Sequence, residues 1–256
     1  MRYIKGQKGI FEKEILRLIG SEQILFYREL LESNQSKLTK THSKNYYLII
    51  VTLATLLSIL FSIQFLDRLV ALKVMEILRS NHVLHTSTSN IPDILPYIVY
   101  IGTAIMWFDF LYLSHSKRRD DQRRFLQLAA LAVPIAYILK TYLQYAFGRT
   151  NTRLWLTTHT ELKFNWFHGA GIGCFPSGHM TVFTAFGVAV WYIYPRYRRI
   201  TVLGLSLLGA ALIATDYHFL SDVIAGAYIG MLVTYIIQAI LKRFGLDLWI
   251  TENYKL

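Results

Sequence analysis

The stretch C-F-P-S-G-H-M-T-V-F-T-A-F-G-V-A-V-W-Y-I-Y, from Cys174 to Tyr194, joins a short polar turn to an apolar segment. After His179 it continues for fifteen residues without a charged side chain. An uncharged run of this length favours a membrane helix whose polar ends lie in the headgroup region. The serine, glycine and histidine at its start suggest that chemistry takes place where this helix meets the membrane surface.

The rest of the chain repeats this apolar pattern in blocks. It has 256 residues, 54% of them hydrophobic, and a mean hydropathy of +0.34. Lipid offers no partner to a free backbone N–H or C=O, so helices are the expected form of each crossing. We therefore predict an all-α, polytopic membrane protein with six transmembrane helices at Tyr46–Leu66, Leu95–Ser114, Phe125–Phe147, Met180–Tyr194, Ile200–Thr215 and Val223–Leu241.

The positive charge indicates how the chain is oriented. The net charge is +11, and Lys and Arg gather in residues 1–44, in the loop after the second block, in the link after the fourth and directly after the sixth. Loops rich in Lys and Arg stay in the cytoplasm, so both termini are expected there. The basic faces are expected to touch anionic lipid head groups rather than nucleic acid. Residues 1–45 are predicted to form a cytoplasmic amphipathic segment, and residues 46–256 one membrane domain.

With six crossings, the polar clusters of the chain fall on one membrane face. The link 148–179 and the short link 214–222 both lie on the outer side, and they hold most of the residues able to do chemistry. Long polar loops on a helical frame commonly carry function. These two loops are therefore the predicted active-site loops.

These loops hold the parts of a phosphate site. Ser177 and Gly178 precede a helix, whose N-terminal N–H groups attract anions. Arg149 can grip a phosphate with two hydrogen bonds. His218 and Asp222 are four residues apart, so the carboxylate can orient the imidazole, and an oriented imidazole is a competent nucleophile. A second histidine, His179, can serve as the acid. No metal or other cofactor is required.

Other interpretations of the same residues are weaker. A metal site could be formed by His179, His218, Asp216 and Asp222. A serine hydrolase could use Ser177 and His218, but no G-x-S-x-G motif is present. Cys174 is the single cysteine, which excludes an intrachain disulfide, and we expect it to be an ordinary small loop residue.

The motifs F-P-S-G-H, Y-H-F-L-S-D-V-I-A-G and F-G-R-T resemble the type 2 phosphatidic acid phosphatase superfamily, over roughly residues 95–241. The resemblance implies that His218 attacks phosphorus with Asp222 as its partner. It implies that His179 protonates the leaving oxygen and that Ser177 and Gly178 hold the phosphate.

The chain departs from the basic positions of that family. Its first motif is Lys, six residues, Arg and Pro, and these positions hold Gln144, Asn151 and Thr152 here. The arginine expected six residues before the histidine of the last motif is Leu212. Three cations nearby could bind the phosphate instead. Arg149 is expected to contribute most and Arg153 less, while Lys140 is expected to act mainly through stability. Gln144 is also a candidate substrate-binding residue.

The function predicted from the sequence is hydrolysis of a lipid phosphate or diphosphate through a phosphohistidine, on a phospholipid or an isoprenoid phosphate. The expected place is a bacterial inner membrane, with the active site on the periplasmic or outer face. Two alternatives stay open. One is a phosphotransferase that uses the same histidine with an alcohol acceptor. The other is a lipid-binding or transport relative without turnover.

Overall fold

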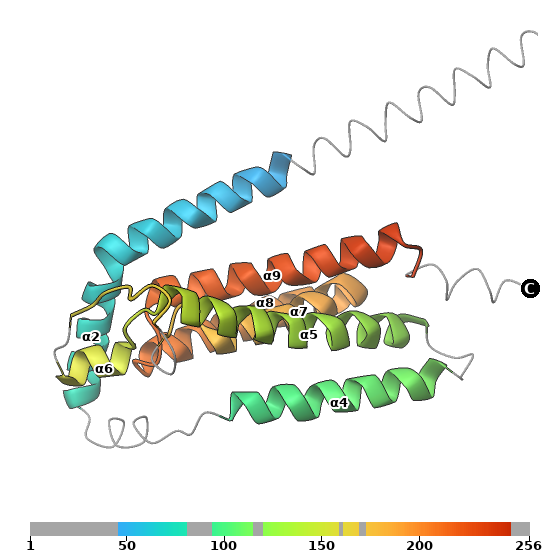
Figure 1. The fold of residues 1–256 in the computed structure, drawn as a ribbon, viewed down its shortest axis with the longest axis horizontal. Helices are drawn as coiled ribbons and strands as arrows, with labels where there is room; N and C mark the ends of the chain where they lie inside the picture. The colour runs from blue at the N-terminus through green and yellow to red at the C-terminus, as the bar shows by residue number, and fades with distance from the viewer. Residues whose placement is uncertain (1–45, 81–93, 115–119, 159–160, 169–172, 247–256) are drawn as a thin grey trace, which may run out of the picture. The chain divides into compact units, whose positions relative to one another are not determined.

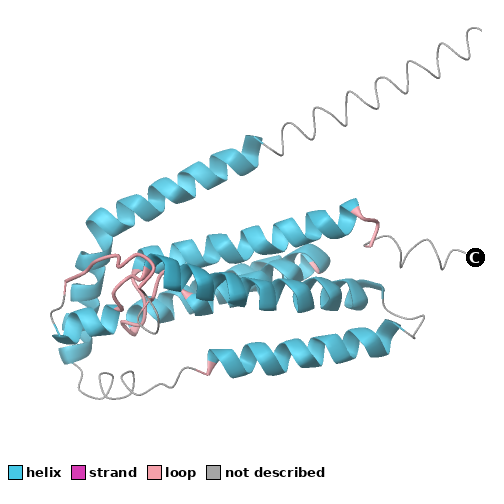
Figure 2. Ribbon diagram, viewed as in Figure 1, coloured by secondary structure: helices cyan, strands magenta, loops and turns pink. Residues whose placement is uncertain are grey.

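The structure is a computed structural model that describes residues 46–80, 94–114, 120–158, 161–168 and 173–246. Every named element within these ranges is a helix, as Figure 2 shows. The all-helical prediction is therefore confirmed for the described part of the chain. The predicted amphipathic segment 1–45 lies outside the described residues.

The helices follow one another in the order shown in Figure 1. The first helix covers residues 46–61 and continues without a break into a π-helical turn, η1. The elements after residue 61 are η1 (Ser62–Leu66), α2 (Asp67–Ser80), α4 (Leu95–Ser114), α5 (Asp120–Phe147), α6 (Thr152–Thr158), α7 (Gly178–Ile193), the 3₁₀ turn η2 (Pro195–Tyr197), α8 (Arg198–Ala214) and α9 (Leu220–Arg243).

The chain divides into two compact units, Met1–Ala54 and Thr55–Leu256. Of the first unit the structure describes residues 46–54, a helical segment in which the Thr52 hydroxyl donates to the carbonyl of Leu48 over 2.7 Å. The predicted boundary between a segment 1–45 and a domain 46–256 stays a prediction. Apart from residues 46–54 of the first helix, the elements discussed below belong to the second unit.

Among the described residues, four helices are long and apolar enough to cross a membrane: Tyr46–Ser80, Asp121–Phe147, Pro195–Ala214 and Leu220–Arg243. Two shorter apolar helices accompany them, Tyr97–Leu113 and Gly178–Ile193. Large apolar side chains such as Phe108, Ile138 and Leu207 are exposed, an arrangement that suits lipid rather than water. These helices mark an integral membrane protein, while six crossings and the orientation of the termini stay predictions.

The core lies between α5, α7 and α9, which run alongside one another in Figure 1. Small side chains dominate the contact, with Ala129, Ala132 and Ala136 of α5 facing Ala185 and Ala189 of α7. In lipid, close packing replaces the hydrophobic effect as the force between helices, and small residues permit the closest approach. The α4 helix packs on α5, and α8 packs on α7.

A G-x-x-x-G motif brings α9 directly against α7. A Cβ atom added to Gly226 would stand 2.6 Å from the carbonyl oxygen of Ser177. A Cβ added to Gly230 would overlap the carbonyl oxygen of Thr181 and stand 2.9 Å from the amide nitrogen of Ala185. Because the obstructing atoms are backbone, they cannot move aside as a flexible side chain would. The two helices that begin beside the P-S-G-H turn are therefore in main-chain contact.

Within the second unit, the chain changes direction between residues 55–61 and α2, as Figure 1 shows. The change follows the π-helical turn Ser62–Leu66, a feature that commonly bends helices. α2 begins immediately afterwards at Asp67 and buries Asp67, Ala71 and Leu78. Ala71 packs with Leu156 and Phe219 beside the polar loops. The bend therefore delivers one carboxylate, that of Asp67, to the interior at this end of the bundle.

Gly230→Ala should destabilise the protein, because its methyl group meets the α7 backbone. Overpacking of this kind costs about 1–3 kcal/mol, and each kcal/mol lowers Tm by roughly 2–4 °C in a chain of this size. The matched control is Gly204→Ala in α8, where an added Cβ meets nothing within 4 Å. Thermal unfolding of both variants in the same detergent measures the difference. A Gly230→Ala protein as stable as the control would contradict the close contact.

Candidate active site

The P-S-G-H turn forms the N-terminus of α7. Ser177 is the N-cap, and its Oγ accepts a hydrogen bond of 3.3 Å from the backbone N–H of Met180. The Ser177 N–H donates to the carbonyl of Asp222 over 3.0 Å, so this residue also joins α7 to α9. The next two N–H groups, of Gly178 and His179, start the helix and have no acceptor within it. This end of α7 is thus suited to an anion, with Ser177 acting as the cap.

Asp222 stands close to His218 at the start of α9. Its Oδ2 lies 3.6 Å from His218 Nδ1 and accepts a hydrogen bond of 3.0 Å from the backbone N–H of Phe219. The helix begins only at Leu220, so His218 and Asp222 meet across a helix cap. The pairing expected from their spacing is present, although a shared helical face is not its cause. Both side chains are buried.

The two histidines come together from different helices. The ring centroids of His179 and His218 are 6.5 Å apart. The ring of Tyr217 packs edge-on against both, at 5.3 Å from His179 and 5.1 Å from His218. Sequence reasoning did not single out Tyr217, although its place next to a candidate catalytic histidine was a signal. Among the described residues, no group forms a hydrogen bond with His218 Nδ1. The Asp222 carboxylate is its ionic neighbour, at 3.6 Å.

Arg149, predicted to grip the phosphate, is buried and bonded to protein groups. Its Nη1 donates to Asp222 Oδ1 over 2.5 Å and to Ser221 Oγ over 2.6 Å, and its Nη2 donates to Asp67 Oδ2 over 2.6 Å. Burial by itself lowers the pKa of Arg149, but Asp222 and Asp67 outweigh that effect, and the net shift is upward.

Aromatic rings surround the Arg149 guanidinium. It lies over the rings of Phe164, Phe175 and Phe219, which form a cation–π cage. In this arrangement Arg149 holds carboxylates rather than facing an open site.

Asp67 is a second site residue that the sequence did not reveal. Its Oδ1 accepts from the backbone N–H of Ser221 over 3.0 Å, and its Oδ2 accepts from the Ser221 hydroxyl over 2.5 Å. Asp67 and Asp222 are fully buried, on either side of one buried arginine. The signal in the sequence was an acid placed directly after the first apolar block.

Lys140 reaches the P-S-G-H turn from α5. A Cβ atom added to Gly178 would stand 3.2 Å from Lys140 Nζ, so the ammonium group lies beside the start of α7. Its Nζ donates to Gln144 Oε1 over 3.3 Å, and Gln144 Nε2 donates to the carbonyl of Pro176 over 2.9 Å. Gln144, which occupies the position of the family's lysine, therefore ties α5 to the turn. Lys140, one turn earlier, is the cation that the structure brings to this turn.

Arg153 lies on α6, beside Tyr217. Its guanidinium stacks over the Tyr217 ring at 4.9 Å and donates to the carbonyl of Thr215 over 3.1 Å. Asp216, which follows Thr215 and interacts electrostatically with Arg153, has a left-handed backbone with φ of 52°. Burial raises the pKa of Asp216 to about 6, with Arg153 acting in the opposite direction. Arg153 thus borders the histidine pair through Tyr217.

The remaining altered motif positions have structural roles. Asn151 caps α6, with its Oδ1 accepting from the backbone N–H groups of Arg153 and Leu154. Thr152 is fully buried. Leu212 packs with Met180 and Val223 in a buried apolar cluster. An apolar cluster therefore occupies the position where the family pattern has a cation.

Cys174 belongs to the shell around Asp222. Its thiol lies 3.2 Å from Asp222 Oδ2 and 3.2 Å from the carbonyl of Thr150, and burial is the main reason that its pKa is raised well above the usual value. A metal site is the alternative use of this region, because Cys174, His218 and Asp222 are close enough together to act as ligands. A protonated thiol is a poor metal ligand, and the positive charge of the neighbouring Arg149 repels a cation. The alternative set that includes Asp216 and His179 is not among the ligand groups found in the described residues.

Comparison with known proteins agrees with the motifs. The model of the PAP2 superfamily matches residues 125–245, from α5 to the end of α9. A solved structure described as the first transmembrane PAP2-type phosphatidylglycerolphosphate phosphatase, from Bacillus subtilis, is similar at 19% identity with a TM-score of 0.45. That similarity covers 75% of this chain and 96% of the other. No curated protein matches. The match to the family model confirms the resemblance predicted from the sequence.

Proposed function

We propose that this chain, whose residues 125–245 match the model of the PAP2 superfamily, is a membrane phosphatase that hydrolyses a lipid phosphate or diphosphate through a phosphohistidine. The observation that carries the proposal is the pair of histidines 6.5 Å apart, one of them backed by a buried carboxylate at 3.6 Å. A nucleophile oriented by a third group, beside an acid and an anion site, suits phosphoryl transfer.

The first step forms a bond between His218 and phosphorus. His218 Nδ1 faces Asp222, so the opposite ring nitrogen, Nε2, is the nucleophile. As the N–P bond forms, the bond from phosphorus to the lipid oxygen breaks, and His179 donates its proton to that oxygen. The attacking imidazole becomes positively charged, and the Asp222 carboxylate stabilises this charge. The lipid alcohol, or the lipid phosphate in the case of a diphosphate, leaves.

The second step returns the enzyme to its starting state. Water attacks phosphorus opposite His218, and His179, now neutral, takes the proton from that water. The N–P bond breaks, and inorganic phosphate leaves. Throughout, the N–H groups of Gly178 and His179 and the ammonium of Lys140 hold the phosphoryl oxygens. No metal takes part in either step.

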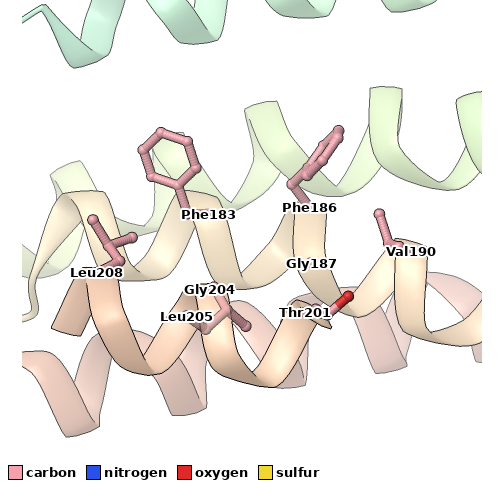
Figure 3. Close-up of a pocket in the computed structure, with 8 residues that line it drawn as sticks. All are labelled: Phe183, Phe186, Gly187, Val190, Thr201, Gly204, Leu205 and Leu208. Carbon is pink, nitrogen blue, oxygen red and sulfur yellow. The ribbon is translucent and has the colours of Figure 1, made fainter. Parts of the chain in front are cut away.

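Apolar grooves beside α7 suit the hydrocarbon part of such a substrate. Figure 3 shows one between α7 and α8, with a volume of about 360 Å³, lined by Phe183, Phe186, Leu205 and Leu208 among others. A larger groove of about 680 Å³ reaches α9 at Val223 and Ile224, the two residues that follow Asp222. Because this second groove is the larger one and is lined by the first turn of α9, we assign it to the lipid chain.

A phosphotransferase is the second candidate, favoured by one observation. Leu212 and the capping residue Asn151 leave fewer cations than the family pattern has. A site with fewer cations and more apolar surface could admit an alcohol in place of water. Release of inorganic phosphate identifies the hydrolase, and transfer of labelled phosphate to a second lipid identifies the transferase.

Replacing His218 tests the proposed nucleophile. Purified wild-type protein should release phosphate from at least one member of a panel of phosphatidate, phosphatidylglycerophosphate, polyprenyl diphosphate and lipid A. His218→Ala should lose several orders of magnitude in kcat and form no acid-labile phosphoenzyme, while Tm stays close to the wild-type value. EDTA should have little effect and vanadate should inhibit. Retention of more than about a tenth of the activity would remove His218 from the nucleophile's role.

The cation that binds phosphate is tested by ranking three variants. Lys140→Gln should lower kcat/KM by about 100-fold, as expected for loss of a charge contact to the transferring group. Arg153→Gln should cost less, because its guanidinium lies on Tyr217. Arg149→Gln should act chiefly on Tm, because its charge holds buried carboxylates. Kinetics and thermal unfolding measured on the same preparations separate the two effects. A Lys140→Gln enzyme with wild-type kcat/KM would return the phosphate contact to one of the arginines.

We place the active site at the outer face of the membrane because the basic links lie on the other side of the crossings. Cys174 cannot report on this, because it is only 2% exposed. In a Cys174→Ser background, a cysteine replacing exposed Thr157 on α6 should react with a membrane-impermeant thiol reagent in intact bacterial cells. A cysteine replacing exposed Arg199 at the start of α8 should react only after permeabilisation. The opposite labelling pattern would move the site to the cytoplasmic face.

A further inference from the structure

The buried charges around Asp222 do not sum to zero. Asp67 and Asp222 carry two negative charges and Arg149 one positive charge, and all three side chains are at most 1% exposed. Arg149 binds each carboxylate through a different terminal nitrogen. One negative charge therefore remains in the cluster, in a place where charges interact strongly because water is excluded.

The remaining charge is directed at His218. Asp222 uses Oδ1 for Arg149, and its Oδ2 lies 3.6 Å from His218 Nδ1. Without Asp67, the single charge of Arg149 would be balanced by Asp222 alone, and the cluster facing His218 would be neutral. Cys174 does not replace the missing anion, since its raised pKa keeps the thiol protonated. Arg153, the other nearby arginine, interacts with Asp216 and Tyr217.

We infer that Asp67 is a positioning residue for the proposed reaction: by balancing Arg149, it leaves the charge of Asp222 available to the imidazole of His218. Asp67 contacts neither histidine and acts through Arg149 and Ser221. It lies on α2, outside the residues 125–245 that the family model matches. The inference rests on the proposed phosphohistidine mechanism, to which it adds a residue from a separate part of the chain.

A carboxylate that faces Nδ1 makes the neutral imidazole a better nucleophile at Nε2 and stabilises the positive charge that forms on attack. Asp67 should therefore change the rate of attack and leave phosphate binding unchanged. Loss of a purely structural contact would instead lower stability and binding together. These two expectations differ in measurable ways.

The test compares Asp67→Asn with wild type by two readouts. The first is carbethoxylation of His218 by diethyl pyrocarbonate at pH 8, followed by mass spectrometry with exposed His168 as an internal standard, and it needs no turnover. The second is kcat together with the inhibition constant of inorganic phosphate. Asp67→Asn should slow His218 modification and lower kcat, each on the order of tenfold, with the phosphate inhibition constant within about twofold. The matched control is Glu76→Gln, an exposed acid on the same helix, which should change neither.

The double variant Asp67→Asn with Arg149→Gln separates charge balance from simple contact loss. It restores one net negative charge beside His218, so His218 should react faster in it than in Asp67→Asn alone. Slower or equal reaction of His218 in the double variant, or wild-type rates in Asp67→Asn, would overturn the inference.

If Asp67→Asn does not fold, Asp67→Gln and Asp67→Glu, which are matched in length, take its place. The Glu variant should then retain the His218 reactivity that the Gln variant loses. A wild-type protein inactive on every lipid would refute the phosphatase proposal, while the modification rates would still decide the role of Asp67.

Discussion

The ion pairs of Arg149 with Asp67 and Asp222 join the parts of this protein that must meet for the proposed site to exist. They connect the start of α2, the loop after α5 and the first turn of α9, segments that are far apart in the chain. Removing one partner from a buried ion pair leaves an uncompensated charge and typically costs about 3–5 kcal/mol. Aromatic rings cover the guanidinium and exclude water from it. The orientation of Asp222 is thus coupled to the folding of the whole end of the bundle.

The sequence was sufficient for the features that depend on local pattern. Apolar blocks predicted the helices, and the P-S-G-H turn predicted the N-terminus of α7. The approach of His218 to Asp222 followed from their spacing, although a helix cap produces it. Asp67 could not be predicted in this way, since 154 residues separate it from its partner Ser221. No local rule says which distant charges meet inside a fold.

Which cation reaches the P-S-G-H turn also depends on the tertiary structure. Arg149 looked available because it follows a helix end, but burial and two carboxylates engage it. Lys140 looked too low on α5, yet its long flexible side chain brings both the end of its stem and its charge to the turn. Gln144 accepts a hydrogen bond from Lys140 and donates one to the Pro176 carbonyl. The residue at the position of the family's lysine therefore supports the P-S-G-H turn. The proposed phosphate environment therefore depends more on the helix N-terminus than on fixed guanidinium groups.

The contact of Gly226 with Ser177 has a consequence for how this sequence can vary. α7 and α9 meet here through main-chain atoms, and each helix begins beside one of the two histidines. The distance between the two histidines is therefore set by this backbone contact and depends little on the shape of any one apolar side chain. Exchanges among leucine, valine and phenylalanine in the core should therefore leave the two histidines in place. Gly226 and Gly230 cannot be exchanged in this way, because any side chain there would meet the backbone of α7.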